Sequence, residues 1–199
     1  MTNPVYPAYD TETISGLLSL RFPQREALLR LDNILSAVKL QKPTAEGVLP
    51  EAQSTLASIH ELFPICTDFE RDFLSLTFAL ATGVGKTRLM GAFITYLYAQ
   101  HGLKDFFVVA PNITIYDKLR QDLGNPESEK YVFRGLGCFS SPPALYTNDD
   151  YRQKRLIESD IRIFVYNIDK FNTEGARMRS VNEVLGESFV GWLGDRKST

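Results

Sequence analysis

The chain has 199 residues, of which 44% are hydrophobic and 23% charged, the balance of an ordinary globular protein with a sizeable core. Its formal net charge of −2 excludes a global basic field, so any contact with nucleic acid must come from a local face. Cys66 and Cys138 lack the spacing of a metal site, and no apolar run approaches the ~20 residues needed to cross a bilayer. We therefore expect a soluble, cytoplasmic protein with reduced thiols and no membrane partner.

The N-terminal part of the chain predicts a loose segment, a long helix and an insertion. Residues 1–12 are expected to form a flexible arm. From Pro23 onward, apolar residues recur with the period of an α-helix, at Ala27, Leu28, Leu31, Ile34, Leu35 and Val38. Residues 42–54 (KPTAEGVLPEAQS) have the composition of a linker or insertion, and a short helix is expected over residues 56–62.

Residues 81–87 (ATGVGKT) form the most informative segment. They lie between a strand-like run, residues 73–80 (FLSLTFAL), and an apolar helix-like run, residues 89–99 (LMGAFITYLYA). Strand, glycine-bearing turn and helix N-terminus are the context that a phosphate-binding loop requires. The alternative is an ordinary glycine turn with a solvated lysine, and this context disfavours it. The segment therefore predicts binding of a nucleoside triphosphate.

Each residue type in the loop suits that chemistry. Gly83 and Gly85 allow the backbone to turn tightly and to approach a polyphosphate closely. The first N–H groups of the following helix lack intrahelical partners and point at the anion. Lys86 would reach the β- and γ-phosphates, and the Thr87 hydroxyl would bind Mg²⁺. We expect Lys86 and Thr87 to be the catalytic residues of the loop. The expected nucleotide-binding residues are Thr82, Gly83, Val84, Gly85, Lys86, Thr87 and Arg88.

The C-terminal half predicts two further strands, residues 106–110 and 161–166, which read as continuous apolar runs. Between them, Thr114 can cap a helix with Asp117 in its first turn, and this helix would end at residues 124–126. Residues 125–150 are rich in Pro, Ser, Gly and Asn and predict a long surface excursion. Strands separated by helices predict an α/β fold, a mostly parallel sheet with helices on both faces.

The motifs ATGVGKT, APNITIYDKL and IFVYNIDKF, in that order, resemble the start of the motor domain of superfamily 2 helicases and translocases. Leu80 replaces the leading glycine that nucleotide kinases and small GTPases usually keep. The chain most resembles the restriction (Res) subunit of type III restriction enzymes, specifically over residues 70–125. The resemblance implies a RecA-like P-loop NTPase lobe that binds ATP with Mg²⁺ and moves on duplex DNA. It also implies a modification methyltransferase subunit as partner.

The resemblance assigns roles outside the loop. Gln24 matches the position of a glutamine that reads adenine, for which a side-chain amide offers a donor and an acceptor together. The alternative for Gln24 is a solvated residue in the first turn of a helix. Phe22 could stack on the base or belong to the core.

The segment after the second strand corresponds to motif Ia, which contacts the nucleic-acid backbone. Asn112 and Thr114 are expected to hold a DNA phosphate at the carboxyl end of a parallel strand. Asn167 ends the third strand at the same sheet edge and could also touch DNA, although loop polarity explains it equally well. Lys118 and Arg120 are expected on the solvated face of a helix.

Phosphoryl transfer to water also requires an acidic element that holds Mg²⁺. In this superfamily it is an Asp-Glu pair that ends an apolar strand, and Asp149, Asp150, Asp160 and Asp169 do not fit that pattern. We therefore expect residues 13–171 to form a partial first motor lobe, incomplete at the C-terminus, and residues 172–199 to form an irregular tail that ends before the acidic box. Such a chain would bind ATP but hydrolyse it very poorly. Two alternatives stay open: part of another superfamily 2 DNA or RNA helicase, or a non-catalytic nucleotide-binding interaction module.

Overall fold

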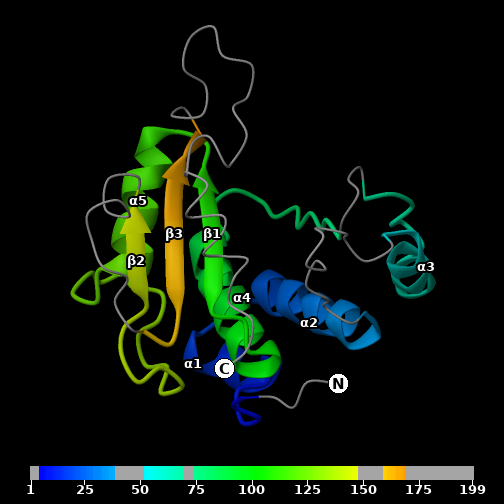
Figure 1. Cartoon of the computed structure of the whole chain (residues 1–199), viewed down its shortest axis with the longest axis horizontal. Coiled ribbons are helices and arrows are strands. Elements are labelled where there is room, and N and C mark those ends of the chain that lie inside the picture. The colour runs from blue at the N-terminus through cyan, green and yellow to red at the C-terminus, as the bar shows by residue number, and fades with distance from the viewer. Residues whose placement is uncertain (1–4, 39–51, 70–73, 148–158, 169–199) are drawn as a thin grey trace, which may run out of the picture. The chain divides into compact units, whose positions relative to one another are not determined.

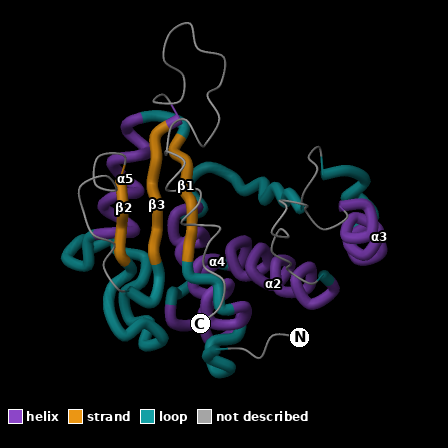
Figure 2. Tube along the Cα trace, viewed as in Figure 1, coloured by secondary structure: helices purple, strands orange, loops and turns teal. Residues whose placement is uncertain are grey.

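The computed structural model describes residues 5–38, 52–69, 74–147 and 159–168 (Figure 1). The chain divides into two units, Met1–Gly102 and Leu103–Thr199. Within the described residues, the regular elements of the first unit are all helices, and those of the second are a small sheet and one helix (Figure 2). The elements in chain order are α1 (Thr11–Leu17), α2 (Phe22–Ala37), α3 (Ala52–Leu62), α4 (Lys86–His101), β1 (Asp105–Ala110), α5 (Ile113–Gly124), β2 (Ala144–Thr147) and β3 (Arg162–Asn167).

In the first unit, α1, α2 and α4 pack against one another, and α3 packs against α2. The apolar stripe predicted for α2 is confirmed, because its buried residues are Gln24, Ala27, Leu28, Leu31, Ile34 and Leu35. The helix α4 is buried on most of its circumference, which agrees with its nearly continuous apolar sequence. A short helix near residues 56–62 is also confirmed, although α3 begins earlier and takes in residues 52–54 of the expected insertion. Residues 42–51 lie outside the described part.

The N-terminal arm differs from the prediction. In its described part, residues 5–12, the chain is attached to the end of α4 rather than loose. The Tyr6 N–H donates to the Ala99 carbonyl at 3.0 Å, and the Gln100 amide donates to the carbonyls of Tyr6 and Tyr9 at 3.3 and 2.8 Å. Tyr6 also packs on the Tyr98 ring, with centroids 5.7 Å apart. These contacts satisfy a carbonyl in the last turn of α4, where no intrahelical donor remains.

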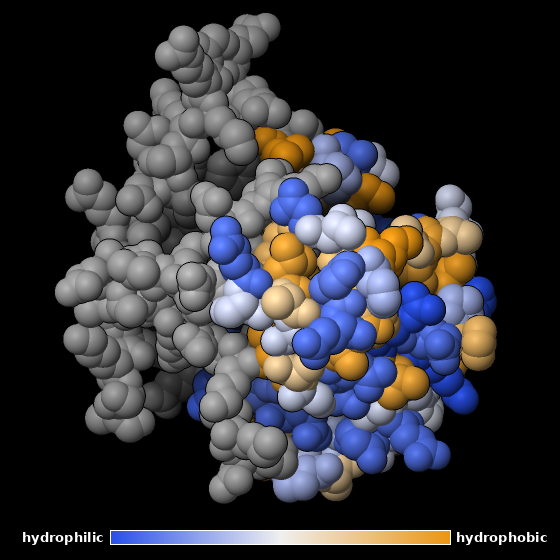
Figure 3. Space-filling model, turned by 90° about the vertical axis from the view of Figure 1, so that its right-hand side faces the viewer, coloured by the Kyte–Doolittle hydropathy of each residue, from blue (hydrophilic) through white to orange (hydrophobic). Residues whose placement is uncertain are grey.

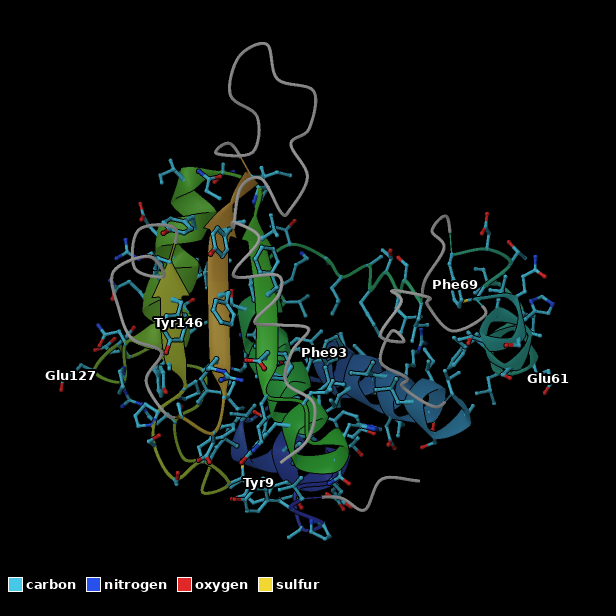
Figure 4. All side chains as sticks on the ribbon, in the orientation of Figure 1. Tyr9, Glu61, Phe69, Phe93, Glu127 and Tyr146 are labelled. Carbon is cyan, nitrogen blue, oxygen red and sulfur yellow. The ribbon has the colours of Figure 1, made fainter. Side chains whose placement is uncertain are left out.

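The strand predicted before the loop is not observed. Residues 74–80, the described part of that run, have no regular secondary structure, and Phe78 makes an edge contact with Phe93 of α4 at 4.9 Å between ring centroids. Phe93 is labelled on α4 in Figure 4. An extended segment becomes a strand only when its backbone groups pair with a neighbour. Residues 74–80 do not pair with a neighbouring strand in this way, so the strand prediction is wrong for these residues.

In the second unit, three strands form a parallel sheet in the order β1-β3-β2 (Figure 2). The predicted strands β1 and β3 are confirmed as direct neighbours, with Phe107 opposite Phe164 and Ala110 opposite Asn167. The central strand β3 is buried along its whole length, as its continuous apolar sequence indicates. A bidentate ion pair joins the first residues of the two strands: Arg162 Nε and Nη2 lie 2.5 and 2.6 Å from the Asp105 carboxylate oxygens.

The two faces of the sheet differ. The helix α5 packs on all three strands (Figure 1), and the Leu145 side chain of β2 lies against Gly124 at the end of this helix. Side chains alternate along a strand, so Tyr146 lies on the opposite face, where its ring stacks on Phe164 with centroids 5.1 Å apart. Among the described residues of this unit, α5 is the helix that covers the sheet. The prediction of helices on both faces is therefore met on one face.

The expected surface excursion over residues 125–150 is wrong for its described part. Residues 125–147 bury Val132, Phe133, Leu136 and Cys138 and contain β2. The Val132 N–H donates to the Asp122 carbonyl at 2.9 Å, which ties the segment to α5. Abundant Pro, Gly and Ser gave this stretch irregular secondary structure without keeping it at the surface. Residues 148–158 and 169–199, which include the expected tail, lie outside the described part.

Candidate nucleotide-binding site

The turn before α4 has the backbone that an anion-binding loop needs. Gly83 and Gly85 both adopt left-handed conformations, with φ of +81° and +93°. Gly85 is the N-cap residue of α4 and supplies no side-chain cap, and the first helical hydrogen bond runs from the Leu89 N–H to the Gly85 carbonyl at 3.2 Å. The N–H groups of the first turn therefore have no partner within the helix and add to the positive end of the helix dipole. This geometry confirms the predicted turn and helix, although not the predicted strand.

The side chains of the loop are accessible. Lys86 is exposed, and its ammonium group donates to the Ala81 carbonyl at 3.0 Å. Thr82 is exposed, whereas Val84 and Thr87 are half-buried. An exposed lysine folded back onto its own loop can turn outward toward a phosphate at the cost of one solvated hydrogen bond.

The Arg88 side chain points away from the loop and contacts the end of α1. Its guanidinium donates to the Leu18 carbonyl at 3.4 Å, at the end of α1. Arg88 can still offer a backbone N–H from the first turn of α4. The side chain of this predicted site residue therefore points to the connection between α1 and α2.

The helix α2 contacts the loop through two side chains. Gln24 is buried, with 1% of its surface exposed: its Oε1 accepts from the Arg21 N–H at 2.7 Å and its Nε2 donates to the Gly85 carbonyl at 2.9 Å. Arg21 donates from Nη1 to the Gly83 carbonyl at 3.3 Å. The solvated alternative for Gln24 is wrong because the side chain is buried. Adenine reading by Gln24 stays a prediction.

Arg21 was not among the residues predicted to contact the loop. The available signal was an arginine three residues before the glutamine, which is the spacing that brings two side chains to the same side of a helix end. Phe22, beside them, is 74% exposed, so the core alternative for this aromatic is wrong. On the face shown in Figure 3, hydrophobic and hydrophilic side chains are interspersed.

Of the four aspartates that do not fit the acidic-box pattern, Asp160 lies within the described residues. Asp160 accepts from the Ser140 backbone N–H and hydroxyl at 2.6 and 2.5 Å, and this hydroxyl bond holds the pKa of Asp160 below its usual value. Asp149, Asp150 and Asp169 lie outside the described residues. Within the described ranges, no group of three or more His, Cys, Asp or Glu side chains could hold a metal ion.

The second unit contains the residues predicted to contact DNA. Asn112 is the N-cap of α5, and its Oδ1 accepts from the Ile115 N–H at 2.9 Å. The prediction that Thr114 caps this helix is therefore wrong, because Asn112 is an equally good cap placed two residues earlier. As a result, Asp117 is the fifth residue of α5 and lies beyond its first turn. Its Oδ1 atom lies 3.7 Å from Arg120 Nη1, which makes an ion pair on the helix surface.

The structure brings Asn112, Thr114 and Asn167 to one edge of the sheet. β1 and β3 are parallel and Ala110 lies opposite Asn167, so the residues that follow β1 and end β3 share the carboxyl edge. Asn112 and Thr114 are exposed there, whereas Asn167 is buried, with 4% of its surface exposed. Lys118 and Arg120 are exposed on α5, as expected. The edge thus offers two exposed polar side chains and one buried amide.

A glycine turn that opens a helix and a small parallel α/β sheet are each features of phosphate-loop nucleotide-binding proteins. The family model described as "Type III restriction enzyme, res subunit" matches residues 17–190, most of the chain. The chain belongs to this family. Membership implies a RecA-like phosphate-loop fold and a helicase-like ATPase module, with which the observed helices and parallel sheet are consistent. Neither a curated protein nor a solved structure matches the chain.

No helix in the described ranges is both long enough and apolar enough to cross a membrane.

Proposed function

We propose that this chain binds ATP with Mg²⁺ as the nucleotide-binding part of an ATP-dependent DNA helicase or translocase of a type III-like restriction endonuclease. The observation that carries the proposal is the start of α4, where two glycines with positive φ leave the first-turn N–H groups uncapped beside an exposed lysine. Lys86 neutralises the β- and γ-phosphates, and the Thr87 hydroxyl binds Mg²⁺. Thr82, Val84 and Arg88 add backbone N–H groups.

The test compares wild type with Lys86→Ala by titrating a fluorescent ATP analogue in the presence of Mg²⁺. Loss of a charged donor costs about 1.5–3 kcal/mol, so affinity should fall by roughly tenfold to a hundredfold. Lys118→Ala, which removes an exposed lysine from α5, is the matched control and should bind like wild type. Equal affinity of wild type and Lys86→Ala would refute the proposal. ATP turnover in the same samples tests the expectation that this chain binds ATP without hydrolysing it efficiently.

We further propose that the N-terminus of α5 holds a phosphate of duplex DNA through Asn112 and Thr114. Both side chains are exposed at the carboxyl edge of the sheet, where helix N–H groups attract anions. Asn167 lies at the same edge, but its burial requires a local rearrangement before its amide can reach DNA. Thr114 is not the cap, so Thr114→Ala can remove a phosphate contact without removing the cap of the helix.

DNA binding is measured by fluorescence anisotropy of a labelled duplex at several salt concentrations. Thr114→Ala should weaken binding to all sequences alike, because phosphate contacts carry no sequence information. Unchanged binding by Thr114→Ala would contradict this role. Coupling between ATP and DNA binding separates the motor from the alternative of a non-catalytic nucleotide-binding module, which would bind each ligand independently. Another superfamily 2 helicase remains the second candidate, and the methyltransferase partner is tested by co-purification.

A further inference from the structure

Three carbonyl groups of the loop, at alternate positions, accept hydrogen bonds from side chains. The carbonyls of Ala81, Gly83 and Gly85 accept from Lys86, Arg21 and Gln24, respectively. Two of the three donors come from α2, sixty-one and sixty-two residues away along the chain. The start of α2 therefore holds the loop on both sides of Val84.

The direction of a carbonyl fixes the direction of the next N–H group. A trans peptide unit is planar, and its C=O and N–H bonds point in opposite directions. The described residues contain no cis peptide bond. When Arg21 and Gln24 hold the carbonyls of Gly83 and Gly85, the N–H groups of Val84 and Lys86 must point away from these donors. Neighbouring N–H groups that converge on one point form the concave arrangement that binds phosphate.

We propose that Arg21 and Gln24 are positioning residues of the phosphate loop, which orient the N–H groups of Val84 and Lys86 toward the polyphosphate. Through them, α2 raises affinity for the phosphate chain whatever base is attached. This inference rests on the proposed function, because it concerns the same nucleotide site. It differs from adenine reading, which would act on the base alone.

The contacts of Gln24 favour this role. Its amide is buried, and both of its polar atoms already have partners in the protein, at 2.7 and 2.9 Å. The Oε1 contact to the Arg21 N–H fixes the orientation of the amide, so the NH₂ group faces the loop. Gly85 is required for this approach, since a Cβ atom there would lie 2.9 Å from Gln24 Nε2. Arg21 is exposed and its bond is longer, 3.3 Å, so its effect should be smaller.

The experiment measures binding of three ligands to the full chain by isothermal titration calorimetry: inorganic tripolyphosphate, ATP and GTP. The variants are Gln24→Ala, Arg21→Ala and Arg21→Lys, with Arg30→Ala as a control that removes the same charge from an exposed position of α2. Loss of one well-formed hydrogen bond predicts that Gln24→Ala weakens all three ligands by about fivefold, with an unchanged ratio of ATP to GTP affinity. Arg21→Ala should weaken all three by about threefold. Arg21→Lys retains a donor and should recover part of that loss.

The outcomes separate this inference from the proposed function. If wild type binds none of the three ligands, the proposed function fails. If wild type binds them through Lys86 but Arg21→Ala and Gln24→Ala leave tripolyphosphate affinity unchanged, the proposed function stands and the positioning role is overturned. A loss confined to ATP would show that Gln24 reads adenine instead. Thermal unfolding of each variant identifies any that fails to fold, and the exposed Arg21 keeps the test decisive if Gln24→Ala does not fold.

Discussion

Replacing Gly85 by alanine should destabilise the chain by a predictable amount. Gly85 has a φ of +93°, where an L residue costs about 1–2 kcal/mol relative to glycine. The new methyl group would also lie 2.9 Å from Gln24 Nε2, too close for the amide to stay in place. Displacing the amide removes one hydrogen bond, worth about 1 kcal/mol net. The free energy of unfolding should therefore fall by about 2–3 kcal/mol.

Gly83→Ala is the matched control. Gly83 has nearly the same backbone conformation, with a φ of +81°, but no atom lies within 4 Å of its ideal Cβ position. This variant should lose only the backbone contribution, about 1–2 kcal/mol. The difference of about 1 kcal/mol between the two variants then measures the contact with Gln24. Urea unfolding followed by circular dichroism gives both values.

The same pair of variants in a Gln24→Ala background provides the decisive comparison. Without the amide, Gly85→Ala meets no side chain and should cost the same as Gly83→Ala, so the coupling between positions 24 and 85 appears as a non-additive free energy. Equal costs for both glycine variants in the wild-type background would refute the reasoning. A gap that persists in the Gln24→Ala background would refute it as well, because the cause would then lie elsewhere in the loop.

Three further predictions concern the second unit. Gly124→Ala should lower the free energy of unfolding by about 1–3 kcal/mol, because the new Cβ would lie 2.7 Å from Cδ2 and 3.0 Å from Cβ of Leu145; thermal unfolding measures this loss. Asn112→Ala should destabilise α5 by about 1 kcal/mol through loss of its cap, measured by urea unfolding. Hydrogen bonding lowers the pKa of Asp160, so its stabilising contribution is present above the ordinary carboxyl pKa and is lost as pH falls through the lowered value; Ser140→Ala should raise this pKa in an NMR titration.

The parts of the fold that the sequence predicted well depend on local signals. The stripe of α2 is a 3.6-residue period, and the start of α4 is marked by two glycines and a lysine, so neither requires knowledge of a distant partner. The strands β1 and β3 are continuous apolar runs between helical segments, which is sufficient to predict buried parallel strands. Their register was not predicted, because a run that is apolar on both faces does not select one alignment.

The parts that failed depend on partners far away in the chain. Residues 74–80 carry a strand-like sequence, but strand formation needs a neighbouring backbone. β2 has only four residues, too few for a periodic pattern, and it becomes a strand because it lies beside β3. The prediction of the α5 cap failed for a different reason. Asn112 and Thr114 are both good capping residues, and only the extended backbone of Asn112, with φ of −160°, shows that Asn112 is the cap.

The candidate site divides in the same way. The turn at Gly83 and Gly85 and the helix that begins at Lys86 were predictable because their signals lie within a few residues of one another. The role of Arg21 was not predictable, because it exists only where the start of α2 approaches Gly83, sixty-two residues further along the chain. Gln24 was predicted to bind adenine because it carries an amide. In the structure its NH₂ group donates to the Gly85 carbonyl, and the sequence does not indicate this partner.

A second contact explains how α2 keeps its donors at the loop. The Tyr96 hydroxyl of α4 donates to the Asp32 carboxylate of α2 at 2.5 Å, and burial raises the pKa of Tyr96, so the hydroxyl keeps its proton. Asp32 lies about 12 Å beyond Gln24 along α2, and Tyr96 about 15 Å beyond Lys86 along α4, at 1.5 Å per residue. These two contacts lie at different points along both helices, so together they help to fix how α2 packs against α4. If Arg21 and Gln24 orient the loop N–H groups as proposed, this helix packing contributes to that orientation together with the glycines, and we expect phosphate affinity to depend on both.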